Sequence, residues 1–126
     1  MENDICALAR LAQAYFDAAH GMDAEVFASL FHPSSSVSSV ASAGDDITVS
    51  VTPIAAWLTA VRAMQAPRRL GLARRDEILS IDAVNGLASI KLTLQIPPRY
   101  FTDMLSCAKI AGAWRIVQKV TRVDCR

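Results

Sequence analysis

Residues 78–96, ILSIDAVNGLASIKLTLQI, carry the pattern that decides the fold. Asn85-Gly86 favours the type I′ turn of a two-residue β-hairpin. After this turn, the apolar residues from Ile90 to Ile96 alternate with polar ones. Such alternation is typical of a strand with one buried face and one face in water. The stretch therefore predicts an antiparallel hairpin with one apolar face.

Further strands are predicted on both sides of this hairpin. The stretch 68–83 has apolar residues around a charged middle and predicts the strand before the turn. Two adjacent prolines after residue 96 break the pairing. Gly112 then separates two more predicted strands, at 99–110 and 114–123. We expect the C-terminal half to form an antiparallel meander.

The N-terminal third has the periodicity of an amphipathic helix. Apolar residues recur at three- or four-residue spacing from Ile5 to Ala19, and they form one apolar stripe. Asn3 or Asp4 can cap the helix at its start. Gly21 is expected to end it, as a glycine after the last helical residue commonly does.

A second, shorter helix is predicted directly after the first. Asp23 is positioned to cap it, its Phe27 and Phe31 face inward, and Pro33 stops it. The stretch 34–44 is rich in Ser, Ala and Gly, which leaves two interpretations open. It forms either a thin pair of strands or a mobile lid.

A short strand and a third helix follow. Residues 47–52 alternate between β-branched apolar and polar residues, as strands do. Thr52-Pro53 has the pattern of an N-cap followed by a proline at the first helical position. Pro67 is expected to end the helix. Its apolar side is formed by Trp57, Leu58, Val61 and Met64.

Helices followed by a meander indicate an α+β fold, with the helices on one face of a curved sheet. No repeat or linker divides the chain, so a single domain is expected over residues 1–126. A bent sheet packed against helices leaves a cone-shaped hollow. That hollow is the default place for a ligand.

The composition is that of one globular domain. The chain has 126 residues, of which 52% are hydrophobic and 20% charged, and this excludes disorder. No apolar run is long enough to span a membrane, and the acidic N-terminus is unlike a signal peptide. Three cysteines without CxxC spacing indicate reduced thiols and a cytoplasmic protein. Neither histidine lies near a cysteine pair, so no metal is predicted.

Charge is distributed unevenly between the two halves. Residues 1–61 hold seven acids and one base, whereas residues 62–126 hold five acids and twelve bases. A basic half can indicate a nucleic-acid partner. This half has few aromatic residues and no known pattern for reading bases, so no nucleic-acid partner is predicted. We expect the acidic half to cover the basic half.

Both ends of the chain resemble one protein superfamily. AYFDAAHGMDAEVFASLFHPSSSV (residues 14–37) and YFTDMLSCAKIAGAWRIVQKV (residues 100–120) resemble nuclear transport factor 2-like proteins, nearest the SnoaL-like or lumazine-binding-like branch. The resemblance covers about residues 5–124. It implies a cystatin-like cone of three N-terminal helices packed on a curved antiparallel sheet. It also implies a homodimer through the polar sheet face of Lys91, Thr93 and Gln95.

The superfamily holds ketosteroid isomerases, polyketide cyclases, dehydratases and non-catalytic domains, so the resemblance implies architecture and not chemistry. An isomerase pairs a carboxylate base with a tyrosine and a neutral aspartic acid. By this resemblance, Tyr15 lies at the place of the tyrosine and Asp103 near that of the neutral acid. The place of the base holds Ser39. Serine is a poor base near neutral pH, and we do not expect steroid isomerisation.

Asp103 and Tyr15 each have a functional and a structural interpretation. The apolar neighbours of Asp103 would favour a neutral carboxyl that donates to a substrate carbonyl. Alternatively, the side chain accepts hydrogen bonds from a neighbouring strand or pairs with Lys119 or with an arginine. Tyr15 is either a ligand contact or a core residue whose hydroxyl is bound by a neighbour.

Four further residues are candidates for the hollow. His32 is a candidate general base, or else a helix-end residue with a local hydrogen bond. Phe31 and Trp57 are candidates for contact with a ligand, although aromatic residues at helical spacing are usually core. Lys119 would pair with Asp103 or with an anionic ligand.

Two functions from different classes follow from these candidates. In the first, a cofactor-independent cyclase, isomerase or dehydratase acts on a small carbonyl compound. Asp103 and Tyr15 would polarise the carbonyl, and His32 would move a proton. In the second, a non-catalytic homodimer holds a small apolar or aromatic ligand in the hollow. We favour the second, because no carboxylate occupies position 39.

Overall fold

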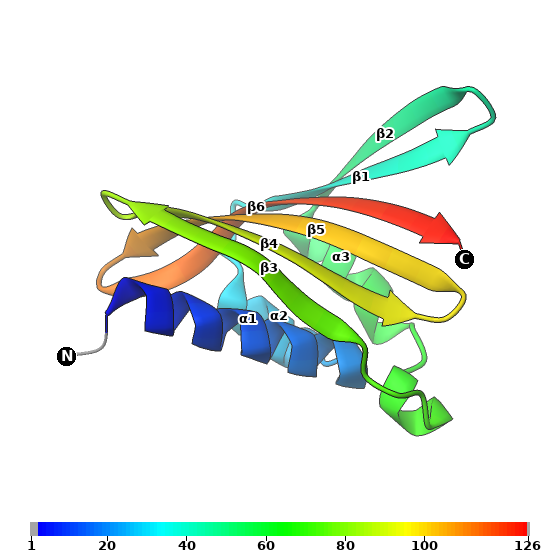
Figure 1. Ribbon diagram of the computed structural model, residues 1–126, viewed down its shortest axis with the longest axis horizontal. Helices are drawn as coiled ribbons and strands as arrows, with labels where there is room; N and C mark the ends of the chain where they lie inside the picture. Colours follow the sequence, from blue (N-terminus) through cyan, green and yellow to red (C-terminus); the bar gives the residue numbers. More distant parts are fainter. Residues whose placement is uncertain (1–2, 126) are drawn as a thin grey trace.

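The computed structural model describes residues 3–125 and has three α-helices and a curved six-stranded sheet (Figure 1). The α+β class is therefore as the sequence predicts. The helices are α1 (Asp4–Gly21), α2 (Ala24–Leu30) and α3 (Ile54–Arg62), with a 3₁₀ turn η1 (Pro67–Leu70). The strands are β1 (Ser36–Ala43), β2 (Asp46–Pro53), β3 (Asp76–Val84), β4 (Leu87–Ile96), β5 (Arg99–Ile110) and β6 (Ala113–Cys125).

The strand order is β2-β1-β6-β5-β4-β3, and one pair departs from the expected antiparallel sheet. β1 runs parallel to β6, with Val37 opposite Lys119. The cause lies where the chain leaves α2. The N–H of His32 donates to the carbonyl of Ile116 at 2.8 Å, and this bond aligns the chain with β6 before β1 begins. Alternation along a strand does not encode the direction of its partner.

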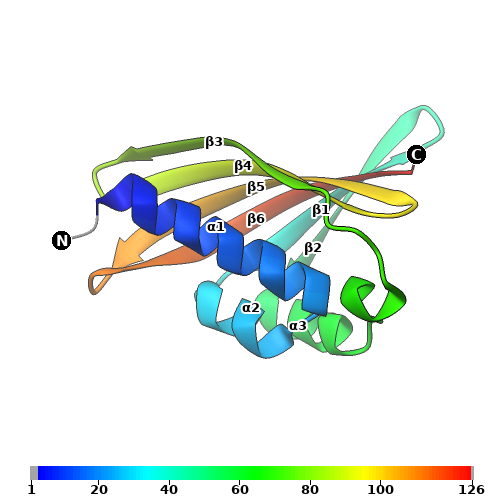
Figure 2. The ribbon, with the colours of Figure 1, turned by 60° about the horizontal axis from the view of Figure 1, so that its bottom comes forward.

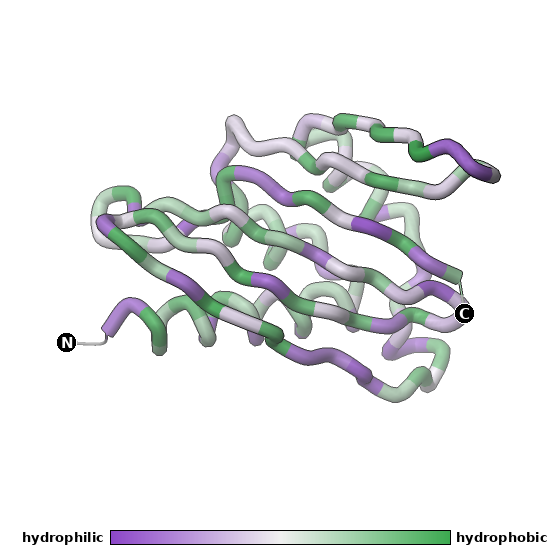
Figure 3. Tube along the Cα trace, turned by 45° about the horizontal axis from the view of Figure 1, so that its top comes forward, coloured by the Kyte–Doolittle hydropathy of each residue, from purple (hydrophilic) through white to green (hydrophobic). Residues whose placement is uncertain are grey.

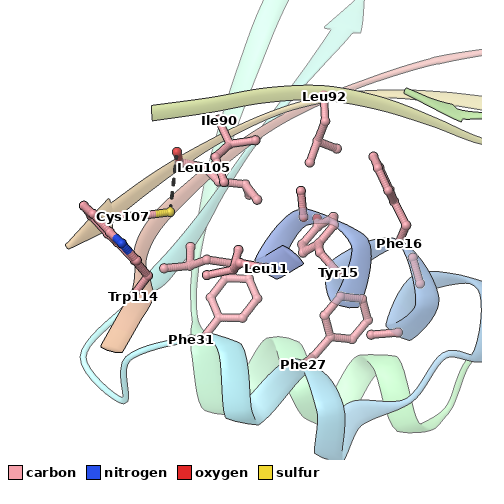
Figure 4. Close-up of a cluster of buried hydrophobic side chains, with 14 of the residues drawn as sticks. Leu11, Tyr15, Phe16, Phe27, Phe31, Ile90, Leu92, Leu105, Cys107 and Trp114 are labelled. Atoms are coloured by element: carbon pink, nitrogen blue, oxygen red, sulfur yellow. Dashed lines mark hydrogen bonds between the residues drawn. The ribbon is translucent and has the colours of Figure 1, made fainter. Parts of the chain in front are cut away.

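All three helices lie against the same face of the sheet (Figure 2). α1 runs along this face under β3, β4 and β6, and α2 and α3 pack beside it. Figure 4 shows how the core forms between the two layers. Tyr15, Phe27 and Phe31 meet Leu92 and Leu105, which point down from the sheet.

α1 begins as the sequence predicts but ends one residue later. Asn3 accepts a hydrogen bond from the N–H of Cys6 at 2.8 Å. Gly21 is still helical, and Met22 takes the left-handed conformation with φ 45°. The N–H of Asp23 donates to the carbonyl of Ala18 at 2.9 Å. This closing bond fixes the reversal at Met22 and leaves Asp23 free to cap α2.

α2 has the predicted cap, whereas α3 does not. The carboxylate of Asp23 accepts from the N–H of Val26 at 3.2 Å. Before α3, Thr52 stays in β2 opposite Val37, and Pro53 occupies the N-cap position without a side-chain hydrogen bond. The prediction of a Thr52 cap was wrong because strand pairing continues to the last residue before the helix.

The start of β3 also differs from the prediction. α3 ends at Arg62 and not at Pro67, which instead opens η1, and Gly71 ends this turn with φ 68°. The strand begins at Asp76, not at residue 68. The hairpin after it is confirmed, since Asn85 and Gly86 have φ 50° and 72°, as a type I′ turn requires.

The serine-rich stretch forms β1, so of the two interpretations the strand pair holds. β1 and β2 make a hairpin that extends past the other strands (Figure 1). β2 is exposed along most of its length. Within the described residues, no helix is both long and apolar enough to cross a membrane.

Candidate functional site

Three side chains converge on the carboxylate of Asp103 in the interior of the protein. Tyr15 Oη donates to Oδ2 at 2.6 Å, and Thr121 Oγ1 donates to Oδ1 at 2.5 Å. Lys119 Nζ lies 3.7 Å from Oδ2. Asp103 is only 1% exposed and Lys119 6%. Both carboxylate oxygens therefore act as acceptors, and a buried cation stands beside them.

Strand register explains this convergence. Asp103 of β5 is paired with Thr121 of β6, so their side chains lie on the same face of the sheet. Lys119 is two residues from Thr121 and therefore shares that face. Tyr15 rises from the buried stripe of α1 to meet them. Two adjacent strands and one helix thus assemble the cluster.

Aromatic rings surround the ammonium group of Lys119. Its Nζ lies 4.4 Å from the ring centre of Trp57 and 5.2 Å from that of Tyr15. Burial lowers the pKa of Lys119, and the charge of Asp103 opposes this shift. Burial, together with the same carboxylate, raises the pKa of Tyr15 well above its ordinary value. Tyr15 is therefore a neutral hydrogen-bond donor at physiological pH.

A cavity of about 150 Å³ adjoins this cluster, and we call it the Asp103 cavity. Most of its lining is apolar and comes from α1, α3 and the strands β4 to β6. An engineered cavity of roughly this volume in another protein binds benzene. The size suits a molecule of one or two rings. The polar part of the lining consists of Tyr15, Ser39, Asp103, Lys119 and Thr121.

Four of the residues singled out from the sequence share this cavity wall. Tyr15, Trp57, Asp103 and Lys119 all line it. Phe31 lies outside the lining, because its ring packs against Tyr15 and Trp57 at centroid distances of 6.5 and 5.5 Å. It supports two cavity residues from within the core.

His32 also lies outside the lining of the cavity. Its Nδ1 accepts from the N–H of Ser34 at 3.1 Å and lies 2.7 Å from the Ser34 hydroxyl. These contacts match the helix-end alternative, with the backbone and hydroxyl of Ser34 as partners in place of a carbonyl. His32 was a candidate because it is the histidine nearest the expected hollow, but the turn after α2 places its ring outside the cavity lining.

The sequence pointed to one of the two remaining polar residues of the lining but not to the other. Ser39 faces the cavity, at the place where the isomerase resemblance would require a base. Thr121 was missed, because nothing in its local sequence marks it. Only the pairing of Thr121 with Asp103 reveals its role.

The chemistry available here is hydrogen bonding and charge pairing. Asp103 accepts one hydroxyl hydrogen bond on each of its two oxygens, and Lys119 Nζ lies 3.7 Å from Oδ2. The imidazole of His32 is not in the lining. Among residues 3–125, no three His, Cys, Asp or Glu side chains come together to hold a metal ion.

Comparison with known proteins gives one family and many related folds. Residues 3–122 match the model of the family described as "Putative lumazine-binding". The comparison with curated proteins found no match. An NTF2-like protein of unknown function from Shewanella baltica OS155 is 18% identical, with a TM-score of 0.84 over 100% of each chain.

Two other solved structures extend the comparison. An NTF-2-like protein of unknown function from Silicibacter pomeroyi DSS-3 is 22% identical, with a TM-score of 0.75 over 95% of each chain. A ketosteroid isomerase-like protein from Erwinia carotovora atroseptica SCRI1043 is 12% identical, with a TM-score of 0.74 over 100% of each chain. At these identities the likeness establishes the fold alone.

Proposed function

Since the chain belongs to the family described as "Putative lumazine-binding", within the NTF2-like superfamily, we propose that it binds a small molecule without changing it chemically. The observation that carries this proposal is the Asp103 cavity, with its apolar walls and its single polar cluster. Such a combination is typical of ligand sites, where a few polar groups orient an otherwise apolar molecule.

The walls of the cavity favour an apolar or aromatic ligand. Trp57, Tyr15 and Phe101 supply ring surfaces, and Leu94 and Val123 supply aliphatic ones. Aromatic rings stack in offset or edge-to-face arrangements that favour another ring. A volume of about 150 Å³, close to that of a cavity that binds benzene in another protein, favours a small ligand.

The polar cluster supports binding better than catalysis. Proton abstraction needs a base that faces the substrate with a free lone pair. Both oxygens of Asp103 already accept a hydrogen bond and a cation stands beside them, which makes the carboxylate a weaker base, and Ser39 has no useful basicity. The alternative is a cofactor-independent cyclase, isomerase or dehydratase that acts on a small carbonyl compound. Only the presence of Tyr15 and Asp103 at the positions of the isomerase resemblance supports it.

Ligand binding is testable by thermal unfolding with toluene and lumazine as probes. A ligand that binds only the folded protein raises the melting temperature by mass action. We expect at least one probe to stabilise the wild type. Val123→Phe, which fills the cavity, should abolish this effect, whereas Val84→Phe at an exposed position should not. Absence of stabilisation by either probe, or its survival in Val123→Phe, would contradict the proposal.

The outer face of the sheet supports a homodimer. Figure 3 is turned toward this face, where hydrophobic and hydrophilic segments alternate along the strands. Ile47, Val49 and Val51 of β2 are 61–66% exposed, and Val120 and Met104 on β6 and β5 add to the same face. We call these five side chains the apolar patch. Exposed apolar surface of this kind marks an interaction site.

A second copy of the chain is the proposed occupant of the apolar patch. A two-fold contact would place each patch against its own equivalent, as in most soluble dimers. The polar residues Lys91 and Gln95, which the sequence suggested as the interface, lie on the same face toward its other edge. Thr93 is already buried within the single chain. We therefore centre the interface on the patch.

The oligomeric state tests this interface. Val49→Asp introduces a charge into the apolar patch and should shift the protein from dimer to monomer in light scattering. Thr48→Asp is the matched control, because Thr48 is the next residue of β2 and faces the opposite side. A wild type that is monomeric at high concentration would refute the dimer, as would a Val49→Asp variant that remains dimeric.

A further inference from the structure

Hydrogen-bond donors in the Asp103 cavity differ in whether they are already used. The hydroxyl protons of Tyr15 and Thr121 are both directed at Asp103. Tyr15 therefore has no proton left for a ligand unless its bond to Asp103 breaks. Its contact is a short, charge-assisted bond of 2.6 Å, which is costly to lose. The two hydroxyl groups serve the carboxylate and not the cavity.

The N–H donors of Lys119, unlike the hydroxyl protons of Tyr15 and Thr121, are not used in a hydrogen bond to Asp103. Its ammonium group has three N–H donors, yet Nζ makes no hydrogen bond to any described residue. The carboxylate oxygen at 3.7 Å is too distant for one, and the rings of Trp57 and Tyr15 contribute only their faces. No fully buried side-chain nitrogen or oxygen of the described residues lacks a hydrogen-bond partner, so Nζ is accessible from the cavity that Lys119 lines. An acceptor atom in the cavity can therefore take a charge-assisted hydrogen bond from Nζ.

Ser39 offers a second unused donor on the same wall. Its hydroxyl makes no hydrogen bond within residues 3–125, and the residue lines the cavity. Ser39 is the register partner of Thr121, and Lys119 is two residues from Thr121 on the same face of β6. Ser39 and Lys119 are therefore diagonal neighbours across adjacent strands. One acceptor group with two lone pairs can lie between them.

We propose that the Asp103 cavity selects ligands with an uncharged carbonyl oxygen on a small apolar or aromatic frame, bound by Lys119 Nζ and Ser39 Oγ. This inference rests on the proposed binding function and names the ligand class. It assigns the carbonyl contact to Lys119 and Ser39, where the sequence suggested Tyr15 and Asp103. It also replaces the anionic ligand that the sequence suggested for Lys119.

The charge balance of the site explains why the ligand is uncharged. Lys119 and Asp103 already offset each other within 3.7 Å. A ligand carboxylate would add one uncompensated negative charge to a buried region beside Asp103. Burial of an unpaired charge is far more costly than burial of a hydrogen-bonded carbonyl. A carbonyl gains a charge-assisted hydrogen bond and leaves the net charge unchanged.

Three probes of nearly equal shape separate the effect of the carbonyl oxygen from the effect of a negative charge: acetophenone, α-methylstyrene and benzoate. α-Methylstyrene has CH₂ in place of the carbonyl oxygen, and benzoate has a charged group. Hydrogen bonds to charged groups stabilise by amounts equivalent to a tenfold or greater change in affinity. We expect acetophenone to bind roughly tenfold or more tightly than either of the others, measured by calorimetry. The carbonyl stretch of bound acetophenone should also shift to lower frequency.

Variants then assign the contact. Lys119→Met should bring the ratio of acetophenone to α-methylstyrene affinity close to one, and Ser39→Ala should reduce it several-fold. If Lys119→Met fails to fold, the charge-neutral double variant Asp103→Asn/Lys119→Met takes its place. Tyr15→Phe should leave the ratio unchanged. Ser50→Ala is the matched control, since Ser50 pairs with Ser39 on β2 but does not line the cavity.

Three of the four contrary outcomes separate the inference from the function on which it rests. Equal affinity for acetophenone and α-methylstyrene would overturn carbonyl selection and leave small-molecule binding intact. A preference that survives loss of Lys119 but disappears in Tyr15→Phe would overturn the assignment of the donor. Tighter binding of benzoate would overturn the argument from charge balance. Absence of binding by all three probes would overturn both proposals.

Discussion

Replacing Asp103 with asparagine removes the negative charge beside Lys119 and keeps the shape of the side chain. The lost electrostatic attraction can be calculated from the distance between Lys119 Nζ and Asp103 Oδ2. At an effective dielectric constant of about 20, unit charges 3.7 Å apart attract by roughly 4.5 kcal/mol. Loss of one partner of a buried pair costs about 3–5 kcal/mol in other proteins. We expect Asp103→Asn to lower the free energy of unfolding by about this amount.

The corresponding change in melting temperature is large enough to measure by calorimetry. An unfolding entropy of about 2.1 cal/mol/K per residue over 126 residues converts this loss into a decrease of roughly 10–20 °C. Asp124→Asn is the matched control. Asp124 lies 3.6 Å from Arg122, nearly the same separation, but both side chains are well exposed. Exposed pairs contribute about 0–1 kcal/mol, so this variant should be nearly neutral.

A double variant separates the loss of charge from the loss of hydrogen bonds. If the cost arises from an unpaired buried ammonium, Asp103→Asn/Lys119→Met should recover most of the stability lost in Asp103→Asn. A double variant less stable than Asp103→Asn would refute this reasoning. It would show that the bonds from Tyr15 and Thr121 dominate instead.

The pH dependence gives an independent check on the same variant. Burial lowers the folded-state pKa of Lys119 below its usual 10.5, and the charge of Asp103 limits this effect. Without that charge, the pKa in the folded protein falls further, while the unfolded chain keeps its ordinary value. Between the two values the unfolded chain binds more protons, so stability rises with pH. Asp103→Asn should therefore recover stability relative to wild type as the pH rises from 7 to 10.

Three other experiments test separate parts of the structure. The Tyr100→Phe variant leaves Tyr15 as the remaining tyrosine. Because burial and Asp103 raise the pKa of Tyr15, ultraviolet absorbance should show no phenolate near pH 10 until the protein unfolds. Above pH 10 the unfolded chain releases this proton and the folded one does not, so stability should fall with pH. Burial raises the pKa of the Cys107 thiol to about 12, so mass spectrometry should find a thiol reagent on the other two cysteines only, until denaturant is added. Asp23→Ala removes the cap of α2 and should cost about 1 kcal/mol in denaturant unfolding; a neutral result would contradict the cap.

Short-range patterns in the sequence were sufficient for most elements of the fold. The Asn85-Gly86 turn, the cap at Asp23 and the strands 87–96 and 99–110 all depend on neighbouring residues, and the structure has each of them. Their conformations follow from local sterics and from the periodicity of apolar residues. Errors arose where a distant partner overrides the local preference, as at Thr52, which stays paired in β2.

The sequence identified only some of the residues that form the candidate site. Asp103 and Tyr15 were identified by resemblance, and both line the cavity. His32, the candidate general base, does not line the cavity, because the turn after α2 and its contacts with Ser34 hold the imidazole elsewhere. Thr121 was missed because its role depends on strand pairing alone.

The sequence by itself determined most of the helices and strands, which of their faces are apolar, and that they form an α+β fold. Only the tertiary structure decided that β1 runs parallel to β6, and therefore that Ser39 and Lys119 share one wall. It also decided that the hydroxyl protons of Tyr15 and Thr121 are directed at Asp103, whereas the N–H protons of Lys119 make no hydrogen bond to it. The reason is physical: local conformation depends on neighbours in the chain, but hydrogen bonds and charge pairs between distant segments depend on register, which packing of the whole domain sets.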